Sequence, residues 1–374
     1  MHKHAVSEKQ PVLLYFTPID WRWIKQRPQF LAEELRRYFD VRVLYPWQNK
    51  RKGLQKKAPT PLRIRPYFRL PTFNGRIKLL CSLNHALQKA QIGWAFRRVK
   101  PDIVWLSHPW QWEYLPVSRV KELIYDCMDD YAALAPVSSD SSKLLTLEAE
   151  LVHRADHIFS SSETLRHLLA SRHRISEDKI HLIRNGYQPQ GISAAAPPER
   201  HRPFQIGYVG TVARWFDFGL LEKSLERYPE VTYHLWGPMD AGMRVPENNR
   251  LFYHGTINHC DIAKAVSGMD ALIMPFQLCD IVQGVDPVKL YEYIDLRKNI
   301  LCVDYQEIQR FAPFVLFYHD WSSFCEALEQ LLQSNRLRYT DAAAQAFLQA
   351  STWEKRVDEI INCLHDTKKR GTHT

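Results

Sequence analysis

The sequence of 374 residues lacks several features that would assign it to a membrane-spanning, secreted or zinc-binding class. No stretch approaches the roughly 20 uninterrupted apolar residues that a membrane-spanning helix needs, so we expect no span. The N-terminal stretch MHKHAVSEKQPVLLYF lacks the apolar core and cleavage site of a signal peptide, and its apolar run predicts a first strand. Seven dispersed cysteines without a C-x-x-C pair favour reduced thiols in a cytoplasm and no metal site.

The sequence also lacks acidic residues over one long window, since residues 41–101 contain no Asp or Glu. The same window holds fifteen Lys and Arg residues with aromatic residues interleaved, so it carries +15 while the whole chain carries +9. The remainder of the chain therefore carries a net −6. Such a surface suits a nucleic acid, an anionic membrane face or a phosphorylated substrate. The alternative is a solvated basic face with no partner.

The first half alternates short apolar runs with stretches of helical spacing. This order predicts a parallel sheet covered by helices on both faces. Ser162 is the expected N-cap of one of these helices. The predicted strands and helices are, in order, strand 11–16, helix 27–39, strands 40–46, 101–108 and 121–129, helix 142–155, strand 156–162, helix 162–171 and strand 179–187.

After a linker rich in Pro and Ala at residues 191–203, the same order begins again. The sequence therefore predicts an α/β protein of two Rossmann-like, doubly wound domains that face a central cleft, at residues 1–190 and 204–350. The second half is expected to contain strands 204–210, 231–237, 250–255, 271–276 and 299–304 and helices 218–228, 259–269 and 351–366.

Ligands of doubly wound domains bind at the carboxyl ends of the strands, so we looked there for chemistry. Asp129 and Asp130 lie at the exit of strand 121–129, whereas Asp126 lies within it and is a candidate for a structural role. Clustered carboxylates suit general-base catalysis or the binding of sugar hydroxyls. The alternative for Asp129 and for Asp130 is to cap the helix that follows.

Trp21, Trp23 and Arg27 follow the first strand, and His108 lies at the exit of strand 101–108. A helix N-terminus near Arg27 would attract anions. We interpret these four residues as candidate ligand contacts. The alternatives are aromatic packing at the domain edge and, for His108, a local cap.

In the second half, three strands end in glycine, at Gly210, Gly237 and Gly255. Glycines on one rim of a parallel sheet would let a diphosphate approach the backbone. Thr211, directly after Gly210, and His254, directly before Gly255, are therefore further candidate diphosphate contacts.

Lys289 and Glu292 lie three residues apart in the stretch PVKLYEYIDLRKNILCVD. The plain interpretation is a salt bridge on a helix surface, worth a few tenths of a kcal/mol, about 0.2 to 0.5. The functional interpretation is a ligand pair, with the cation for a phosphate and the carboxylate for a sugar hydroxyl. A cation early in a helix opposes the macrodipole, and a bound anion would relieve that conflict.

At this point the sequence resembles the GT-B glycosyltransferases, and among them bacterial polysaccharide enzymes of the teichuronic-acid, capsule and exopolysaccharide type. The resemblance covers most of the chain in order. It implies the GT-B fold, transfer of a sugar from a nucleotide donor without a metal or cofactor, and a last segment, 351–374, that crosses back to the first domain. The stretches that carry it are WRWIKQRPQFLAEEL, YDCMDDYAAL, ELVHRADHIFSSSETL, IRNGY, YVGTVARWFDFGLL, HLWGP and DPVKLYEYIDLRKNIL.

The resemblance also implies roles for particular residues. The candidate contacts of the first domain would bind the acceptor and those of the second domain the donor. Glu292 matches a glutamate that usually holds the nucleotide ribose, and Lys289 resembles a lysine that contacts donor phosphates. Arg214, with the loop around Gly210, would help to stabilise the leaving diphosphate. The chain departs from the pattern at Gly284, where many such enzymes have a first donor-binding glutamate.

We therefore expect a glycosyltransferase that uses a nucleotide-diphosphate sugar, with a UDP-sugar favoured, and a lipid-linked or polysaccharide acceptor. We expect it in the cytoplasm, bound peripherally to the anionic inner face of the membrane, with no nucleic acid partner. The rival hypotheses are a nucleic-acid-binding protein that uses the basic window and a GT-B epimerase or inactive relative. Neither retention nor inversion of configuration follows from the sequence.

Overall fold

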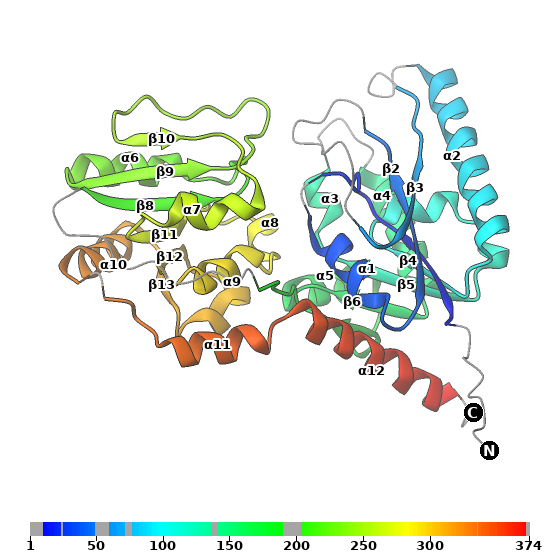
Figure 1. Ribbon diagram of the computed structural model, residues 1–374. Coiled ribbons are helices and arrows are strands. Elements are labelled where there is room, and N and C mark those ends of the chain that lie inside the picture. The colour runs from blue at the N-terminus through cyan, green and yellow to red at the C-terminus, as the bar shows by residue number, and fades with distance from the viewer. Residues whose placement is uncertain are drawn as a thin grey trace. The chain divides into compact units, whose positions relative to one another are not determined.

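The computed structural model describes residues 10–23, 25–48, 60–71, 77–135, 141–189, 203–334 and 336–371. The chain forms two compact units, residues 1–184 together with 356–374 and residues 185–355. In each unit a twisted parallel sheet is flanked by helices (Figure 1). The predicted linker at 191–203 lies outside the described residues except for its last residue, and so do parts of the basic window.

The sheet of the first unit has seven strands in the order β3-β2-β1-β4-β5-β6-β7, and all of its strand pairs are parallel. The chain winds outward from β1 in both directions, so the order reverses between β1 and β4. The strands are β1 (Val12–Phe16), β2 (Asp40–Pro46), β3 (Arg63–Tyr67), β4 (Ile103–Leu106), β5 (Glu122–Cys127), β6 (His157–Ser160) and β7 (Ile180–Leu182).

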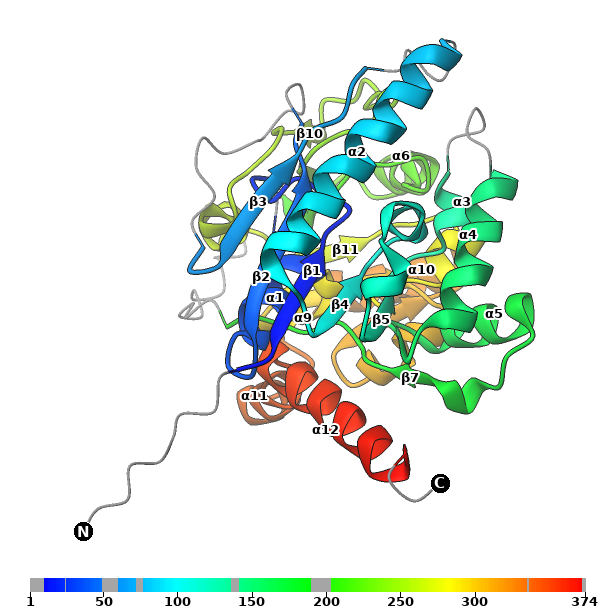
Figure 2. The same cartoon turned by 90° about the vertical axis from the view of Figure 1, so that its right-hand side faces the viewer.

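The helices of the first unit connect these strands and cover their apolar side chains. Leu14, Phe16 and Tyr125 lie in one core with residues of the covering helices. The long helix α2 lies beside β3 (Figure 2). The helical elements are α1 (Arg27–Leu35), α2 (Lys78–Val99), η2 (Pro109–Tyr114), η3 (Val117–Arg119), α3 (Tyr131–Leu134), α4 (Ser141–Arg154), α5 (Glu163–His173) and η4 (Glu177–Lys179).

The sheet of the second unit repeats the first in six strands, in the order β10-β9-β8-β11-β12-β13, again all parallel. Its order reverses between β8 and β11. Strands buried on both faces are continuously apolar, as LLYF in β1 and ALIM in β11 are. The strands are β8 (Phe204–Val209), β9 (Val231–Trp236), β10 (Leu251–Tyr253), β11 (Ala271–Met274), β12 (Asn299–Val303) and β13 (Val315–Tyr318).

The helical elements of the second unit enclose a single large core. They are α6 (Phe218–Arg227), η5 (His259–Asp261), α7 (Ile262–Val266), α8 (Asp280–Gln283), α9 (Val288–Asp295), η6 (Gln306–Phe311), α10 (Trp321–Gln333), α11 (Asp341–Gln349) and the start of α12 (Trp353–Gly371). None of the helices in the described parts of the chain combines the length and apolar character needed to cross a bilayer.

The chain enters and leaves the second unit side by side. Tyr187 and Thr352 form an isolated parallel bridge, and the Tyr187 N–H donates to the Ser351 carbonyl at 2.8 Å. A Cβ on Gly186 would lie 2.6 Å from the Trp353 ring, so only glycine fits this close approach. From Arg356 onward α12 belongs to the first unit, where Asp358 accepts a hydrogen bond from the Tyr38 hydroxyl.

The α/β class and the doubly wound order match the sequence prediction, with differences in particular elements. The helix predicted at 27–39 ends at Leu35, and the helix predicted at 259–269 is the single short helix α7 after a 3-10 turn. The strand predicted at 179–187 is the three-residue β7. The sequence patterns did not predict β3, α2, β13, α10 or α11. The Ser162 cap is confirmed, since its side chain accepts from the Leu165 N–H at 3.1 Å.

Candidate functional site

The three aspartates at the end of β5 have three different environments, and Asp126 is the most deeply buried. Its carboxylate is inaccessible to solvent and forms an ion pair of 2.7 Å with the guanidinium of Arg27. The Arg27 Nε donates to the same carboxylate at 3.1 and 3.2 Å, and Nη1 donates to the Arg184 carbonyl at 3.1 Å. This bidentate pair fixes the start of α1 to the end of β5.

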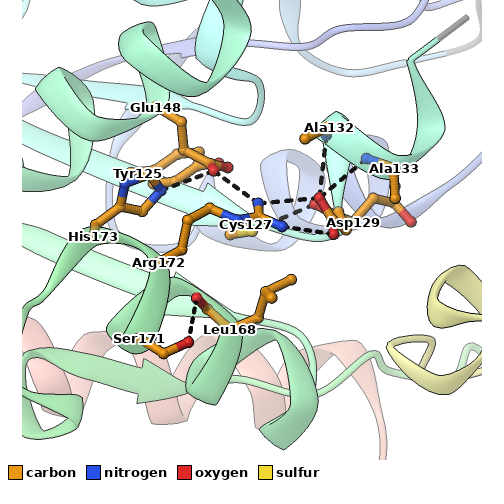
Figure 3. A network of polar contacts seen from close by, with 11 residues as sticks. Tyr125, Cys127, Asp129, Ala132, Ala133, Glu148, Leu168, Ser171, Arg172 and His173 are labelled. Carbon is orange, nitrogen blue, oxygen red and sulfur yellow. Dashed lines mark hydrogen bonds and ion pairs between the residues drawn. The ribbon is translucent and has the colours of Figure 1, made fainter. Parts of the chain in front are cut away.

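Asp130 is the N-cap of α3, where its carboxylate accepts from the Ala132 and Ala133 N–H groups at 3.1 and 3.3 Å. It is also paired with Arg172 at 2.8 Å. Arg172 lies between the start of α3 and the buried Glu148 (Figure 3). Asp130 is therefore a helix cap, because its carboxylate accepts from two N–H groups of α3 and pairs with the guanidinium of Arg172.

Glu148 anchors this network from the core side. It accepts from the Tyr125 hydroxyl at 3.0 Å and lies 2.9 Å from the His173 ring and 3.2 Å from the Arg172 guanidinium. A buried carboxylate needs such partners, since an unpaired charge in the interior is costly. The network holds Arg172 in place toward Asp130.

Asp129 differs from both of its neighbours. Within the described part of the chain its half-buried carboxylate has no hydrogen-bond or ion-pair partner. Burial raises the pKa of Asp129 to about 7, the charges of Asp130 and Asp126 add to the rise, and Arg27 opposes it. A carboxyl group that titrates near neutral pH is poised to exchange a proton.

The four candidate acceptor contacts are placed unequally. Trp21 is only 5% exposed and offers little surface to a ligand, and the Arg27 side chain pairs with Asp126. Trp23 is half-buried. His108 caps the turn η2 by accepting from the Trp110 N–H at 3.1 Å.

The His108 side chain nonetheless lines a pocket. Its ring contacts that of Tyr131, tilted by 43° with centroids 4.1 Å apart, and it lines a cavity at the carboxyl ends of β1 and β4. Burial lowers the pKa of His108 to about 3, and the charge of Arg69 acts in the same direction. The imidazole is therefore neutral at pH 7.

In the second unit the structure brings the three strand-end glycines together. The Gly210 N–H donates to the Trp236 carbonyl at 2.9 Å, and the Gly237 N–H donates to the Gly255 carbonyl at 2.8 Å. Gly237 has a φ of +137°, and a Cβ there would lie 1.9 Å from the Gly210 carbonyl oxygen. Glycine is required at this rim by both backbone conformation and space.

Thr211 and Arg214 are exposed in the loop after Gly210. The His254 ring lies 3.0 Å from the His234 ring and stacks on that of Trp236, and its role as a donor contact stays a prediction. Burial lowers the pKa of His254.

Lys289 and Glu292 form the helix salt bridge, with Nζ and Oε2 2.7 Å apart. Their helix, α9, is fixed at the end of β8, since the buried Tyr293 hydroxyl accepts from the Val209 N–H at 2.8 Å. The pair therefore lies on a helix bonded to the residue before Gly210. The salt bridge does not exclude ligand binding, because it describes the protein without a ligand.

Sequence reasoning missed Asp286 and its partners. The Asp286 carboxylate is buried, accepts from the Asn185 N–H at 2.7 Å and pairs with Arg310. Arg310 also donates to the Tyr291 hydroxyl of α9 at 2.7 Å. The Asn-Gly at 185–186 and the Asp-Pro at 286–287 were the sequence signals for this anchor. Local sequence patterns could not indicate the contact, because Asn185 and Asp286 are 101 residues apart.

Three comparisons with known proteins bear on the fold. The family described as Glycosyltransferase Family 4 matches residues 29–190. Sucrose-phosphate synthase from Thermosynechococcus elongatus matches with a TM-score of 0.72 at 13% identity, over 97% of this chain and 100% of that one. Anabaena HepE, solved with UDP, matches with a TM-score of 0.69 at 13% identity, over 95% of this chain and 100% of the other.

The chain has the GT-B fold. It is also similar to TuaH of Bacillus subtilis (strain 168), a protein named for teichuronic acid biosynthesis, at 24% identity over 262 residues. The match covers 63% of this chain and 62% of that relative. The fold and the resemblance to glycosyltransferases predicted from the sequence are thus confirmed.

The assignment of individual residues to donor and acceptor stays a prediction, as does independence from a metal. Among the described residues of this GT-B protein, no three His, Cys, Asp or Glu side chains come together as a metal site would require.

Proposed function

We propose that this protein is a glycosyltransferase that moves a sugar from a nucleoside-diphosphate donor, a UDP-sugar for preference, to a lipid-linked or polysaccharide acceptor during synthesis of a bacterial surface polysaccharide. The observation that carries the proposal is the bond between Tyr293 of α9 and Val209, which ties the helix that carries Lys289 and Glu292 to the residue before Gly210. The solved complexes of HepE with UDP and UDP-glucose and the name of TuaH support the donor and the pathway class.

The donor site we propose uses backbone and side chains together. The glycine rim lets the diphosphate approach the main chain, with Thr211 and Arg214 in the same loop. Lys289 lies in the first turn of α9, where an anion is favoured and a cation alone is not. A donor phosphate would replace Glu292 as the partner of Lys289, and the carboxylate would then accept from a ribose hydroxyl.

Replacement of Lys289 by Ala should weaken UDP binding while leaving uridine binding nearly unchanged. A hydrogen bond to a charged group contributes ~1.5 to 3 kcal/mol, so we expect roughly a tenfold to hundredfold loss for UDP. Glu292→Gln should weaken both ligands, because each contains the ribose. Isothermal titration calorimetry with uridine and with UDP measures the affinity of each variant and of the unmodified protein for both ligands.

The exposed pair Arg227–Glu329 of the same unit provides the matched control. Arg227→Ala and Glu329→Gln also remove a surface ion pair, but they should leave both affinities unchanged. If Lys289→Ala and Glu292→Gln behave like these controls while remaining folded by circular dichroism, the pair is only a helix salt bridge.

We further propose Asp129 as the general base that accepts the proton of the acceptor hydroxyl, which corresponds to an inverting transfer. Asp126 and Asp130 are each held by an arginine, whereas Asp129 is not paired in the described part of the chain. With its pKa near 7, the carboxylate is half ionised at neutral pH and can take up a proton.

The change Asp129→Asn should lower kcat by ~10²-fold to 10⁴-fold, the usual cost of losing a general base. In the unmodified protein the ionised form is the active one, so kcat should rise with pH through about 7 and then level off. Asp130→Asn keeps a good helix cap and should retain most of the activity, with the pH limb moved to lower pH because the charge of Asp130 adds to the rise of the Asp129 pKa. A kcat within tenfold of normal for Asp129→Asn would instead indicate a retaining mechanism without a protein base.

The first unit also has a surface suited to the peripheral membrane location we propose. Leu79 and Leu83, one turn apart on α2, are 69% and 49% exposed, and Ile77 before them is 44% exposed. The described residues of α2 include four exposed cations, Lys78, Lys89, Arg97 and Arg98, and no carboxylate. An apolar strip among cations is typical of helices that lie on an anionic bilayer.

Co-sedimentation with phosphatidylglycerol vesicles should show binding that falls in high salt and is weak for phosphatidylcholine vesicles. The double change Leu79→Ser and Leu83→Ser should reduce this binding, because it removes the apolar strip. Leu278→Ser, at a similarly exposed leucine of the second unit, is the control and should not. Equal binding to both vesicle types, or none to either, would contradict a membrane location through this surface.

A further inference from the structure

Arg172 lies in the last turn of α5, and its guanidinium contacts two carboxylates at once. Nη1 and Nη2 donate to the two oxygens of Asp130 at 3.1 and 2.8 Å, and Nη1 also donates to Oε2 of Glu148 at 3.2 Å. Figure 3 shows the Arg172 side chain between Glu148 and the start of α3. Bidentate pairing of this kind fixes the geometry of an arginine more firmly than a single bond does.

The position of Arg172 is also set from the core side. Glu148 of α4 is 2% exposed, accepts from the Tyr125 hydroxyl at 3.0 Å and lies 2.9 Å from the ring of His173. Burial lowers the pKa of Arg172, but hydrogen bonds and charge pairing with Asp130 and Glu148 raise it by more, so the guanidinium keeps its charge. Arg172 is therefore a fixed cation beside Asp130.

Asp129 directly precedes Asp130 in the chain, so the charge of one carboxylate acts on the other. A like charge a few ångströms away disfavours ionisation of a carboxyl group. Burial contributes most to the high pKa of Asp129, Arg27 opposes it, and the charges of Asp130 and Asp126 add to the rise. The two neighbouring aspartates thus favour the protonated form of Asp129.

Two further ionisable side chains lie near Asp129, on β5 and α3. Burial raises the pKa of Cys127 and of Tyr131 well above the ordinary values for a thiol and a phenol. Both groups are therefore neutral at pH 7 and add no charge. Among the described residues, the charges that act on Asp129 come from the two neighbouring aspartates and the arginines paired with them.

Each of those two aspartates has an arginine bound directly to it. Arg27 pairs with Asp126 at 2.7 Å, and these two side chains are 4% and 0% exposed. Arg172 pairs with Asp130 at 2.8 Å, and here the exposed fractions are 22% and 12%. The pair at Asp130 is thus the one that a substitution can change without leaving a deeply buried charge alone.

We propose that Arg172 is a positioning residue for Asp129: its bidentate pair cancels the charge of Asp130, so that Asp129 can ionise beside that carboxylate. Arg172 acts through Asp130 rather than on the reacting atoms. That Asp129 is the base of a sugar transfer rests on the proposed function, whereas the effect of Arg172 on the ionisation of Asp129 does not. The plain alternative is that Arg172 only joins α5 to α3 and α4.

Substitution of Arg172 and Asp130, singly and together, separates an electrostatic role from a purely structural one. In Arg172→Met the charge of Asp130 is no longer cancelled, so the midpoint at which Asp129 loses its proton should rise by roughly one pH unit. In Asp130→Asn the cation is left alone, and the midpoint should fall by a similar amount. The double variant lacks both charges, and its midpoint should return close to that of the unmodified protein.

The midpoint is measured by carbon-13 NMR on protein labelled at the aspartate carboxyl carbons, with the Asp129 signal assigned by its loss in Asp129→Asn. Arg166→Met is the matched control and should leave the midpoint unchanged, because Arg166 lies on the same helix and pairs with Glu163 instead. Arg172→Lys keeps the charge, so its midpoint should lie closer to that of the unmodified protein than the midpoint of Arg172→Met does. Thermal unfolding shows which variants are folded.

An unchanged Asp129 midpoint in folded Arg172→Met would overturn the inference. If that variant does not fold, Asp130→Asn and the double variant decide, since equal midpoints for these two would refute a role for Arg172. The titration contains neither donor nor acceptor, so it does not depend on sugar transfer. If the midpoints move as expected and the pH limb of kcat does not follow them, the inference stands and Asp129 is not the base.

Discussion

A buried ion pair between Arg27 and Asp126 is the constraint on which the candidate site of the first unit depends. It joins the start of α1 to the end of β5 and, through Nη1, to the carbonyl of Arg184, the last residue before the second unit. Breaking such a pair by removing one partner typically costs about 3 to 5 kcal/mol, because the other charge remains buried. Arg27 pairs with Asp126 and Arg172 pairs with Asp130, whereas Asp129 has no such partner among the described residues and burial raises its pKa to about 7.

The second unit also has a buried Asp–Arg pair, next to the helix α9 that carries its candidate ligand residues. Asp286 is buried directly before α9, pairs with Arg310, and binds the backbone and side chain of Asn185, where the chain enters this unit. Arg310 in turn donates to Tyr291 of α9. In both units a buried Asp–Arg pair therefore fixes the element that carries the candidate ligand residues. Such pairs are better suited to placing those residues specifically than to adding net stability.

Local chemistry in the sequence predicted the doubly wound order, the Ser162 cap and the glycine rim, since apolar strands and turn glycines depend on near neighbours. The partner of Arg27 lies 99 residues away and that of Asp286 lies 101 away, so no local pattern indicates either pair. β3 was missed because RIRPY alternates cations with a proline, which is atypical of a strand. The long α2 was missed with it, and so was the cavity beside it that His108 lines.

The central claim is that a GT-B fold with a glycine rim and α9 binds a nucleoside diphosphate without a metal. The most direct measurement is calorimetric titration of the unmodified protein with UDP, ADP, GDP and their glucose conjugates, in the presence of EDTA. The account predicts saturable binding at one site, strongest for UDP and its conjugate and unchanged when EDTA is omitted. Absence of binding to every nucleoside diphosphate, or binding that requires Mg²⁺, would contradict it.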